Sequence, residues 1–275
     1  MMNNRLITTN RLLAYLIAFS LICTSCSDDG VDTPSEPAPE IPPITTFEMD
    51  FESFPEDPGG RQILDPKAGA RWAQARIGIA VWNTLIGVAT IVPVAAFKAS
   101  IAQSPEFIGD NTWQWTFDFD VAGIAHQAKL RGTLVSDGVD WSMLLSKEGE
   151  FTDYKWYAGH ANATRTEGSW TLNFGPEQDK PFLQIDWSRN TDNTVAEVRY
   201  TSIDPDNVGI GSYIHFGINE ETPYNAFYDI FDKTNDNLVE IEWNRETNEG
   251  RIKNPRFFED ENYHCWDSDL ENVDC

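Results

Sequence analysis

The stretch TWQWTFDFDV, residues 112–121, alternates large apolar side chains with polar ones. Trp115 and Phe117 fall in one phase of the alternation, and Thr116 and Asp118 fall in the other. Successive side chains of a β-strand point to opposite faces of a sheet. The stretch therefore predicts a strand with one buried face and one solvated face.

The same alternation recurs along the chain, and turn-forming residues separate the apolar runs. Further strands are predicted at GSWTLNF (168–174), LQIDW (183–187) and VEIEW (239–243), with turns at 136–140, 146–150, 174–181, 188–194, 232–237 and 244–250. Regular spacing of short strands is typical of an antiparallel meander. We expect a mainly β fold of about ten strands, curled into an open or closed barrel around one long apolar helix.

That helix is predicted near residues 66–103, around the chargeless stretch IGIAVWNTLIGVATIVPVAAF (77–97). Asp65 and Pro66 form a favourable helix start, with an acidic cap and a proline at the first helical position. Pro93 is expected to kink the helix or divide it in two. The many β-branched residues leave a pair of strands as an alternative.

A helix that is apolar on nearly all sides must be buried in protein or in lipid. The apolar face of the sheet supplies a protein partner, whereas Asn83 would be costly among acyl chains. We therefore expect 77–97, including Leu85, to be buried in the folded domain and not in a bilayer. If the interface is hollow, the arrangement resembles the open barrels with a helical lid of periplasmic lipoprotein carriers.

The first residues have the layout of a signal peptide. Arg5 and Arg11 precede an apolar run, residues 12–22, which is shorter than the roughly 20 residues of a bilayer span. The run ends in CTSC, and here the chain resembles bacterial lipoprotein precursors, which are cut before a cysteine that becomes lipidated. Cys26 matches that cysteine, although Cys23 stands where the family has Leu, Val or Ile. The alternative is ordinary secretion with Cys26 unmodified.

The residues SDD, 27–29, resemble the acidic tag that directs some Gram-negative lipoproteins to the outer face of the outer membrane. The resemblance implies that residues 1–25 are removed and that Cys26 carries acyl chains such as palmitate. Two or more chains hold a protein stably on a membrane, whereas one holds it weakly. The expected location is the cell surface of a Gram-negative bacterium.

Residues 26–46 are predicted to form the lipidated cysteine and an extended tether. The stretch SDDGVDTPSEPAPEIPPITT (27–46) contains five prolines, five acids and no base. Such a composition is typical of linkers without a packed core, and 20 residues would span roughly 60 Å. The remainder, residues 47–275, is predicted to be a single β-rich domain.

Charge and cysteines restrict the partners and the covalent chemistry. The formal net charge of -24 makes nucleic acid an unexpected partner, because phosphate binding depends on clustered Lys and Arg. Contact with the membrane is expected through the lipid anchor.

Cys265 and Cys275 belong to an exported chain, where thiols oxidise, and are predicted to form a disulfide. Two free thiols or a soft-metal site are the alternatives.

The sequence predicts no catalytic residue and no cofactor. The four histidines lack metal-binding spacing, and GxSxG is absent. The acidic C-terminal loop resembles a calcium loop only crudely, because it lacks the glycine and glutamate at the sixth and twelfth positions. Its weak calcium candidates are Asp267, Asp269, Glu271 and Asp274.

Ten tryptophans suggest either a large core or a surface for sugar rings. Trp156 and Tyr157 are adjacent and must point to opposite faces of a strand, so one of them is a possible ligand contact. The leading hypothesis is a lipid-anchored, non-catalytic binding or structural module of unknown ligand. An apolar-ligand carrier with a helical lid, or a carbohydrate-binding or carbohydrate-active surface protein, is the alternative.

Overall fold

The computed structural model describes residues 34–56, 70–192 and 195–275. These residues belong to one compact unit, Thr33–Cys275. The elements, in chain order, are η1 (Ile44–Thr46), η2 (Phe51–Ser53), α1 (Ala70–Ser100), β1 (Glu106–Gly109), β2 (Thr112–Val121), β3 (Ile124–Val135), β4 (Gly138–Lys147), β5 (Phe151–Asn162), β6 (Glu167–Gly175), β7 (Gln178–Arg189), β8 (Ala196–Ser202), β9 (Tyr213–Ile218), β10 (Ala226–Asp232), β11 (Asn237–Trp243), β12 (Gly250–Lys253), α2 (Pro255–Phe258), β13 (His264–Trp266) and β14 (Asn272–Val273).

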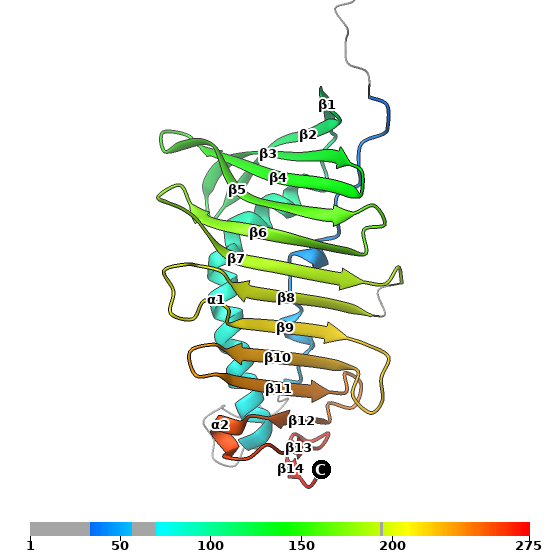
Figure 1. Ribbon diagram of the computed structural model, residues 1–275, viewed down its shortest axis with the longest axis vertical. Helices are drawn as coiled ribbons and strands as arrows, with labels where there is room; N and C mark the ends of the chain where they lie inside the picture. Colours follow the sequence, from blue (N-terminus) through cyan, green and yellow to red (C-terminus); the bar gives the residue numbers. More distant parts are fainter. Residues whose placement is uncertain (1–33, 57–69, 193–194) are drawn as a thin grey trace, which may run out of the picture. The chain divides into compact units, whose positions relative to one another are not determined.

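In the described residues, fourteen strands pair in chain order to form one antiparallel sheet (Figure 1). The predicted mainly β meander is therefore confirmed, but the sheet is open and is not closed into a barrel. Its edges are β1, with four residues, and β14, with two. Strands this short offer few free backbone groups for pairing with each other or with another sheet.

The predicted alternation is confirmed in β2. Trp115 and Phe117 are buried, whereas Thr116 and Asp118 are exposed. We call the side that carries Trp115 the covered face of the sheet and the other side the open face. Each predicted turn region overlaps the connection between two consecutive strands.

Helix α1 crosses the strands on the covered face (Figure 1). Its N-terminal part contacts β12, β13 and β14, and its C-terminal part contacts β2. A helix of 31 residues is about 46 Å long at 1.5 Å per residue. The ten strand spacings from β2 to β12 add up to about 48 Å. The length of α1 thus matches the part of the sheet that it covers.

Pro93 lies inside α1, and of the two expected outcomes, a kink or a division, the continuous helix excludes the division. Proline in a helix interior costs about 3 kcal/mol, because it lacks the N–H of one helical hydrogen bond. The helix continues beyond it because Ala96 and Phe97 are fully buried on the sheet. A continuous helix also excludes the pair of strands, whereas the predicted start at Asp65 and Pro66 lies outside the described residues.

Residues 37–46, the last part of the predicted tether, pack on the domain together with residues 47–56. They lie on the covered face, where Pro42, Thr46 and Phe47 are buried. Lys98 of α1 pairs with Glu48 at 2.6 Å, which places this segment beside the helix. A proline-rich segment suits this position because proline has no N–H that needs a partner. The packed chain therefore begins earlier than residue 47.

Tyrosine hydroxyls of the sheet fasten this segment by its backbone. The Tyr200 hydroxyl donates a hydrogen bond to the Phe47 carbonyl at 2.7 Å and accepts one from the Met49 N–H at 3.1 Å. The Tyr228 hydroxyl donates to the Asp50 carbonyl at 2.8 Å. Buried backbone N–H and C=O groups need hydrogen-bond partners. An irregular segment cannot supply them from its own helix or strand, so side chains of the sheet do so.

Tryptophans of β6 and β11 make equivalent contacts with the same segment. Trp170 donates from Nε1 to the Thr46 hydroxyl at 3.3 Å, and Trp243 donates from Nε1 to the Ser53 carbonyl at 3.2 Å. Both indoles are fully buried on the covered face. These two tryptophans therefore serve the core, because the polar tip and the apolar ring of each are both satisfied.

The helix, the N-terminal segment and the sheet meet at a cluster of four aromatic rings. The ring of Phe47 lies 5.0 Å from Phe97, 4.8 Å from Tyr157 and 5.0 Å from Trp170, measured between centroids. All four side chains are buried. At this position the interface between helix and sheet is filled with side chains and leaves no room beneath a lid.

Cys265 and Cys275 form a disulfide with a Cα–Cα distance of 5.1 Å, which confirms the predicted pair. The closed loop holds the beginning of α1. The Arg71 guanidinium donates to the Cys265 carbonyl at 3.0 Å and also to the Val273 carbonyl. The disulfide therefore stabilises the contact between the C-terminal strands and the helix.

Candidate binding surfaces

A row of charged residues crosses the open face. Cross-strand pairing places the following residues directly opposite one another on β7 to β12: Asp186, Arg199, His215, Asp229, Glu240 and Lys253. Asp186, Arg199, His215 and Asp229 are each flanked in their own strand by two buried apolar residues, and Glu240 and Lys253 by one, Ile241 and Ile252 respectively. Strand alternation therefore directs the whole row away from the core.

The β7–β9 part of the row lies in a shallow depression. Its volume is about 650 Å³, and its lining includes Asp186, Glu197, Arg199, His215 and His160. Gly168 also lines it and contributes no side chain. The site combines carboxylate acceptors with guanidinium and imidazole groups on a rigid sheet.

His215 lies between two carboxylates. Its Nε2 atom is 3.3 Å from Oε2 of Glu197, and its Nδ1 atom is 3.9 Å from Oδ2 of Asp229. Burial lowers the pKa of His215, while the charge of Glu197 opposes the shift. The imidazole is thus favoured in its neutral form, in which one ring nitrogen donates and the other accepts.

Arg199 presents a hydrogen-bond donor without a partner. Its guanidinium carbon lies 3.6 Å from the ring centroid of Tyr213, a cation–π contact that fixes the side chain. Within the described residues, its buried Nε atom has no hydrogen-bond partner. A buried donor left unpaired costs about 1–3 kcal/mol.

Asp229 is the carboxyl group of the row with the most perturbed acidity. Burial raises the pKa of Asp229 to about 6, repulsion from Glu240 and Glu242 adds to the rise, and Arg199 opposes it. The group therefore binds a proton more readily in the folded protein than in the unfolded chain.

We expect the wild-type protein to lose stability relative to Asp229→Asn as pH rises from about 4 to about 7. The folded state retains the proton of Asp229 up to a pKa of about 6, against an ordinary value of 3.8, so ionisation in this window disfavours folding. The relative loss should be about 1 kcal/mol, allowing for partial exposure to solvent. Urea unfolding of both proteins at pH 4.5 and pH 7 measures it. If the difference in unfolding free energy between the two proteins is the same at pH 4.5 and at pH 7, the prediction is wrong.

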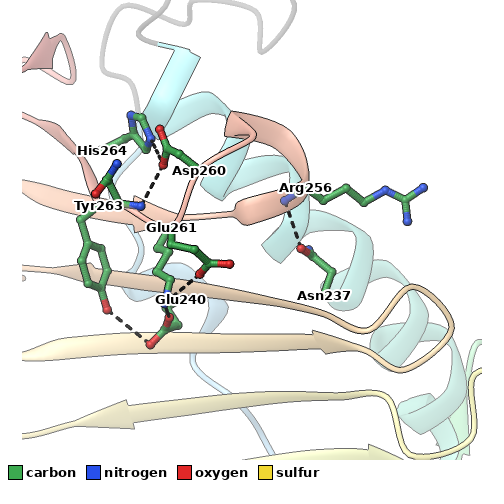
Figure 2. A network of polar contacts seen from close by, with 9 residues as sticks. Asn237, Glu240, Arg256, Asp260, Glu261, Tyr263 and His264 are labelled. Carbon is green, nitrogen blue, oxygen red and sulfur yellow. Dashed lines mark hydrogen bonds and ion pairs between the residues drawn. The ribbon is translucent and has the colours of Figure 1, made fainter.

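The β11–β12 end of the row is closed by a network of satisfied contacts (Figure 2). Lys253 pairs with Glu240 at 2.9 Å and with Glu261 at 3.5 Å. The Tyr263 hydroxyl donates to Glu240 at 3.4 Å. These contacts hold the segment after α2 against the sheet, so this end of the row is structural.

A second surface is the side of α1 that faces away from the sheet. Val81, Leu85, Val88 and Ile91 are exposed there, with Leu85 at 60% and Val88 at 76% of their full areas. Within the described residues, α1 is long and apolar enough to cross a membrane, and only 22% of its most apolar part is buried in the protein. The expectation that 77–97, including Leu85, is wholly buried is therefore wrong. The sheet is a single layer and covers only one side of the helix. Because the helix is apolar on nearly all sides, its sequence does not indicate which side packs on the sheet.

Depressions flank this side of α1. One of about 450 Å³ lies between Leu85 and the strand-end residues Phe174 and Val208. Another of about 700 Å³ is lined by Ile91, Phe174 and Trp156. Both depressions are apolar along the helix and open to solvent.

The predicted contacts Trp156 and Tyr157 do not form one site. Tyr157 is fully buried, and burial raises the pKa of its hydroxyl well above the usual value. Trp156 is half-buried and packs 5.9 Å from Phe151 and 5.7 Å from Tyr154 between ring centroids. Only Trp156 is open to a ligand, in the depression beside Ile91.

The acidic C-terminal residues are not arranged around a cation. The Asp267 carboxylate accepts hydrogen bonds from the backbone N–H groups of Asp269 and Glu271, both at 3.0 Å, and so closes a turn. Asp274 is exposed. Across residues 34–56, 70–192 and 195–275, no group of three or more His, Cys, Asp or Glu side chains is placed to hold a metal ion. Cys26, the predicted lipidation site, lies outside the described residues.

Comparison with protein-family models, curated proteins and solved structures finds no match to this chain. The fold itself defines a helix-backed, single-sheet antiparallel meander. Its functional surfaces must be inferred from their own geometry.

The charged row on the open face was not predicted from the sequence. Its one local signal is a charged or imidazole residue between two apolar residues in mid-strand, as in IDW (185–187), VRY (198–200) and IHF (214–216). The pattern places each side chain on the polar face but does not reveal which ones become neighbours. Neighbours depend on strand register, which only the pairing of whole strands determines.

Proposed function

We propose that the protein is a non-catalytic binding module, held at the outer membrane by lipid on Cys26, and that its open face binds a hydroxyl-rich ligand such as a glycan. The observation that carries the proposal is the depression of the open face, where carboxylates, imidazoles and the Arg199 guanidinium line one surface. The anchor rests on the resemblance of residues 12–29 to lipoprotein precursors.

Sugar hydroxyls suit this surface because each hydroxyl both donates and accepts hydrogen bonds. Asp186 and Glu197 offer acceptors, Arg199 offers donors, and neutral His215 offers one of each. The carboxylates and the net charge of -24 disfavour a polyanion. A neutral, polar ligand therefore fits the depression better than a nucleic acid or a phosphate.

The carrier alternative receives less support at the helix–sheet interface. A movable lid needs space beneath it, whereas Phe47, Phe97, Tyr157 and Trp170 fill the interface where helix, N-terminal segment and sheet meet. Opening α1 would expose these rings to water, at about 1.5–3 kcal/mol for each large side chain. The proposal therefore treats α1 as a fixed part of the core.

Affinity electrophoresis in native gels that contain mannan, xylan, dextran or starch tests glycan binding. At least one polysaccharide is expected to retard the wild-type protein. Arg199→Ala should weaken that binding about 10- to 100-fold, because a hydrogen bond from a charged group contributes about 1.5–3 kcal/mol.

Arg131→Ala is the matched control for this experiment. Arg131 also lies on the open face, but its Nε atom already donates to Gln114 at 2.9 Å. Its replacement should leave the retardation unchanged. Unretarded migration in every gel, or equal behaviour of the two arginine variants, would refute the glycan-binding proposal.

The perturbed acidity of Asp229 favours one second candidate, a glycoside hydrolase. A carboxyl group with a pKa of about 6 can donate a proton near neutral pH, as the acid of such an enzyme must. Release of reducing ends from a retarding polysaccharide, abolished by Asp229→Asn, would establish catalysis in place of simple binding.

A further inference from the structure

The exposed side of α1 forms a continuous apolar ridge, which we define as Ile77, Val81, Leu85, Val88 and Ile91. Their spacing of three or four residues places them on one side of the helix. All five are exposed. No charged residue occurs from Ile77 to Phe97. The ridge therefore presents several turns of uninterrupted apolar surface to the surroundings.

Strand-end residues extend the ridge beyond the helix. Val208, in the loop between β8 and β9, is exposed over 86% of its area. It lines the same depression as Leu85 and Phe174, and Phe174 is also exposed. Single exposed apolar residues are common on proteins, but contiguous patches mark interaction sites. This patch combines a helix with neighbouring loops, so it requires an apolar occupant.

The route of the chain toward Cys26 indicates which surface the occupant belongs to. Pro39 lies on the covered face, where its ring would be 3.2 Å from a Cβ placed on Gly132. The packed segment thus leaves the sheet on the same face as α1. Eight residue steps separate Cys26 from Pro34, the first described residue, and they can span at most about 28 Å. An acyl anchor at Cys26 would keep Pro34 within about 28 Å of the bilayer, a distance that lets the covered face reach it.

We propose that the ridge docks on the surface of the bilayer in which Cys26 is anchored, with its side chains at the boundary between headgroups and acyl chains. This inference rests on the lipid anchor of the proposed function. Apolar helix faces bury at that boundary by the hydrophobic effect. The ridge has no cationic residues, and the net charge of -24 opposes anionic lipids, so the occupant is zwitterionic lipid.

Docking in this manner orients the molecule. The open face, with Arg199 and His215, lies on the other side of the sheet from the ridge. Contact between the ridge and lipid directs the depression of the open face away from the membrane. The same orientation removes from water the apolar surface of Leu85 and Val88, which the sheet leaves uncovered.

Depth-dependent fluorescence quenching tests the docking. The full-length lipidated protein is purified with Val88→Cys or, as a matched control on the open face, Thr116→Cys, and each new thiol is labelled with an environment-sensitive fluorophore. Both positions are exposed, so neither change should disturb the fold. The proteins are reconstituted in phosphatidylcholine vesicles that contain nitroxide-labelled lipid. We expect at least twofold quenching at position 88 and none at position 116.

Flotation of the vesicles separates the two ways in which this experiment can fail. A protein that floats with the vesicles but is not quenched at position 88 has the anchor without the docking, which overturns the inference. Disulfide crosslinking between unlabelled Val88→Cys copies in place of quenching would identify a second copy as the occupant and also overturn it. A protein that does not float would refute the anchor of the proposed function, and the docking with it.

Discussion

Replacing Phe47 with alanine is expected to lower the free energy of unfolding by about 3–5 kcal/mol, a large part of the 5–15 kcal/mol that stabilises a typical domain. Phe47 is 1% exposed, and its ring contacts the helix through Phe97 and the sheet through Tyr157 and Trp170. Its removal leaves a cavity at the point where the three parts of the core meet. Urea unfolding monitored by tryptophan fluorescence measures the loss.

Phe257→Ala serves as the matched control for this change. Phe257 lies in α2 and is exposed, so the same truncation should alter stability by no more than about 0.5 kcal/mol. A loss below 1 kcal/mol for Phe47→Ala would show that residues 37–56 are dispensable to the core.

The composition of residues 27–46 was misleading for a physical reason. Proline and acidic residues are typical of linkers because they do not form a core by themselves. Here the core already exists on the sheet, and the segment adds buried Thr46 and the partly buried Ala38, Ile41 and Ile44 to it. Tyr200 satisfies the Phe47 carbonyl that follows the segment, and Trp170 satisfies the Thr46 hydroxyl, although both are far away in sequence. No local pattern records such long-range partners.

Local sequence was sufficient where the interactions themselves are local. Strand alternation and turn residues predicted the meander, since hairpins depend on neighbouring residues. The compartment and the count of thiols predicted the Cys265–Cys275 disulfide. Neither the exposed ridge on α1 nor the row containing Arg199 and His215 could be derived in the same way. The first depends on which side of a uniformly apolar helix meets the sheet, and the second depends on register across several strands.

Glycines that face tryptophans across the strands show how closely this sheet is packed. Gly159 of β5 lies opposite Trp141 of β4 and Trp170 of β6. A Cβ atom added at Gly159 would lie 2.2 Å from the Ser169 carbonyl oxygen and 2.4 Å from the Trp170 ring. An aromatic ring that covers a strand glycine compensates for its missing side chain. The glycine is therefore part of the packing.

Gly159→Ala is accordingly expected to destabilise the protein by about 3 kcal/mol or more, at the upper end of overpacking costs. The backbone carbonyl of Ser169 can yield only if β5 and β6 separate, which would also disturb the Trp170 contact with Phe47. Gly87→Ala is the matched control, because nothing lies within 4 Å of a Cβ placed at this position of α1. In a helix, that change should stabilise by up to about 1 kcal/mol. The same added methyl group is thus expected to act with opposite signs at the two sites. Thermal and urea unfolding of both variants would measure this difference. A stabilising or neutral effect of Gly159→Ala would contradict the prediction, because it would show that β5 and β6 can move apart without loss of stability.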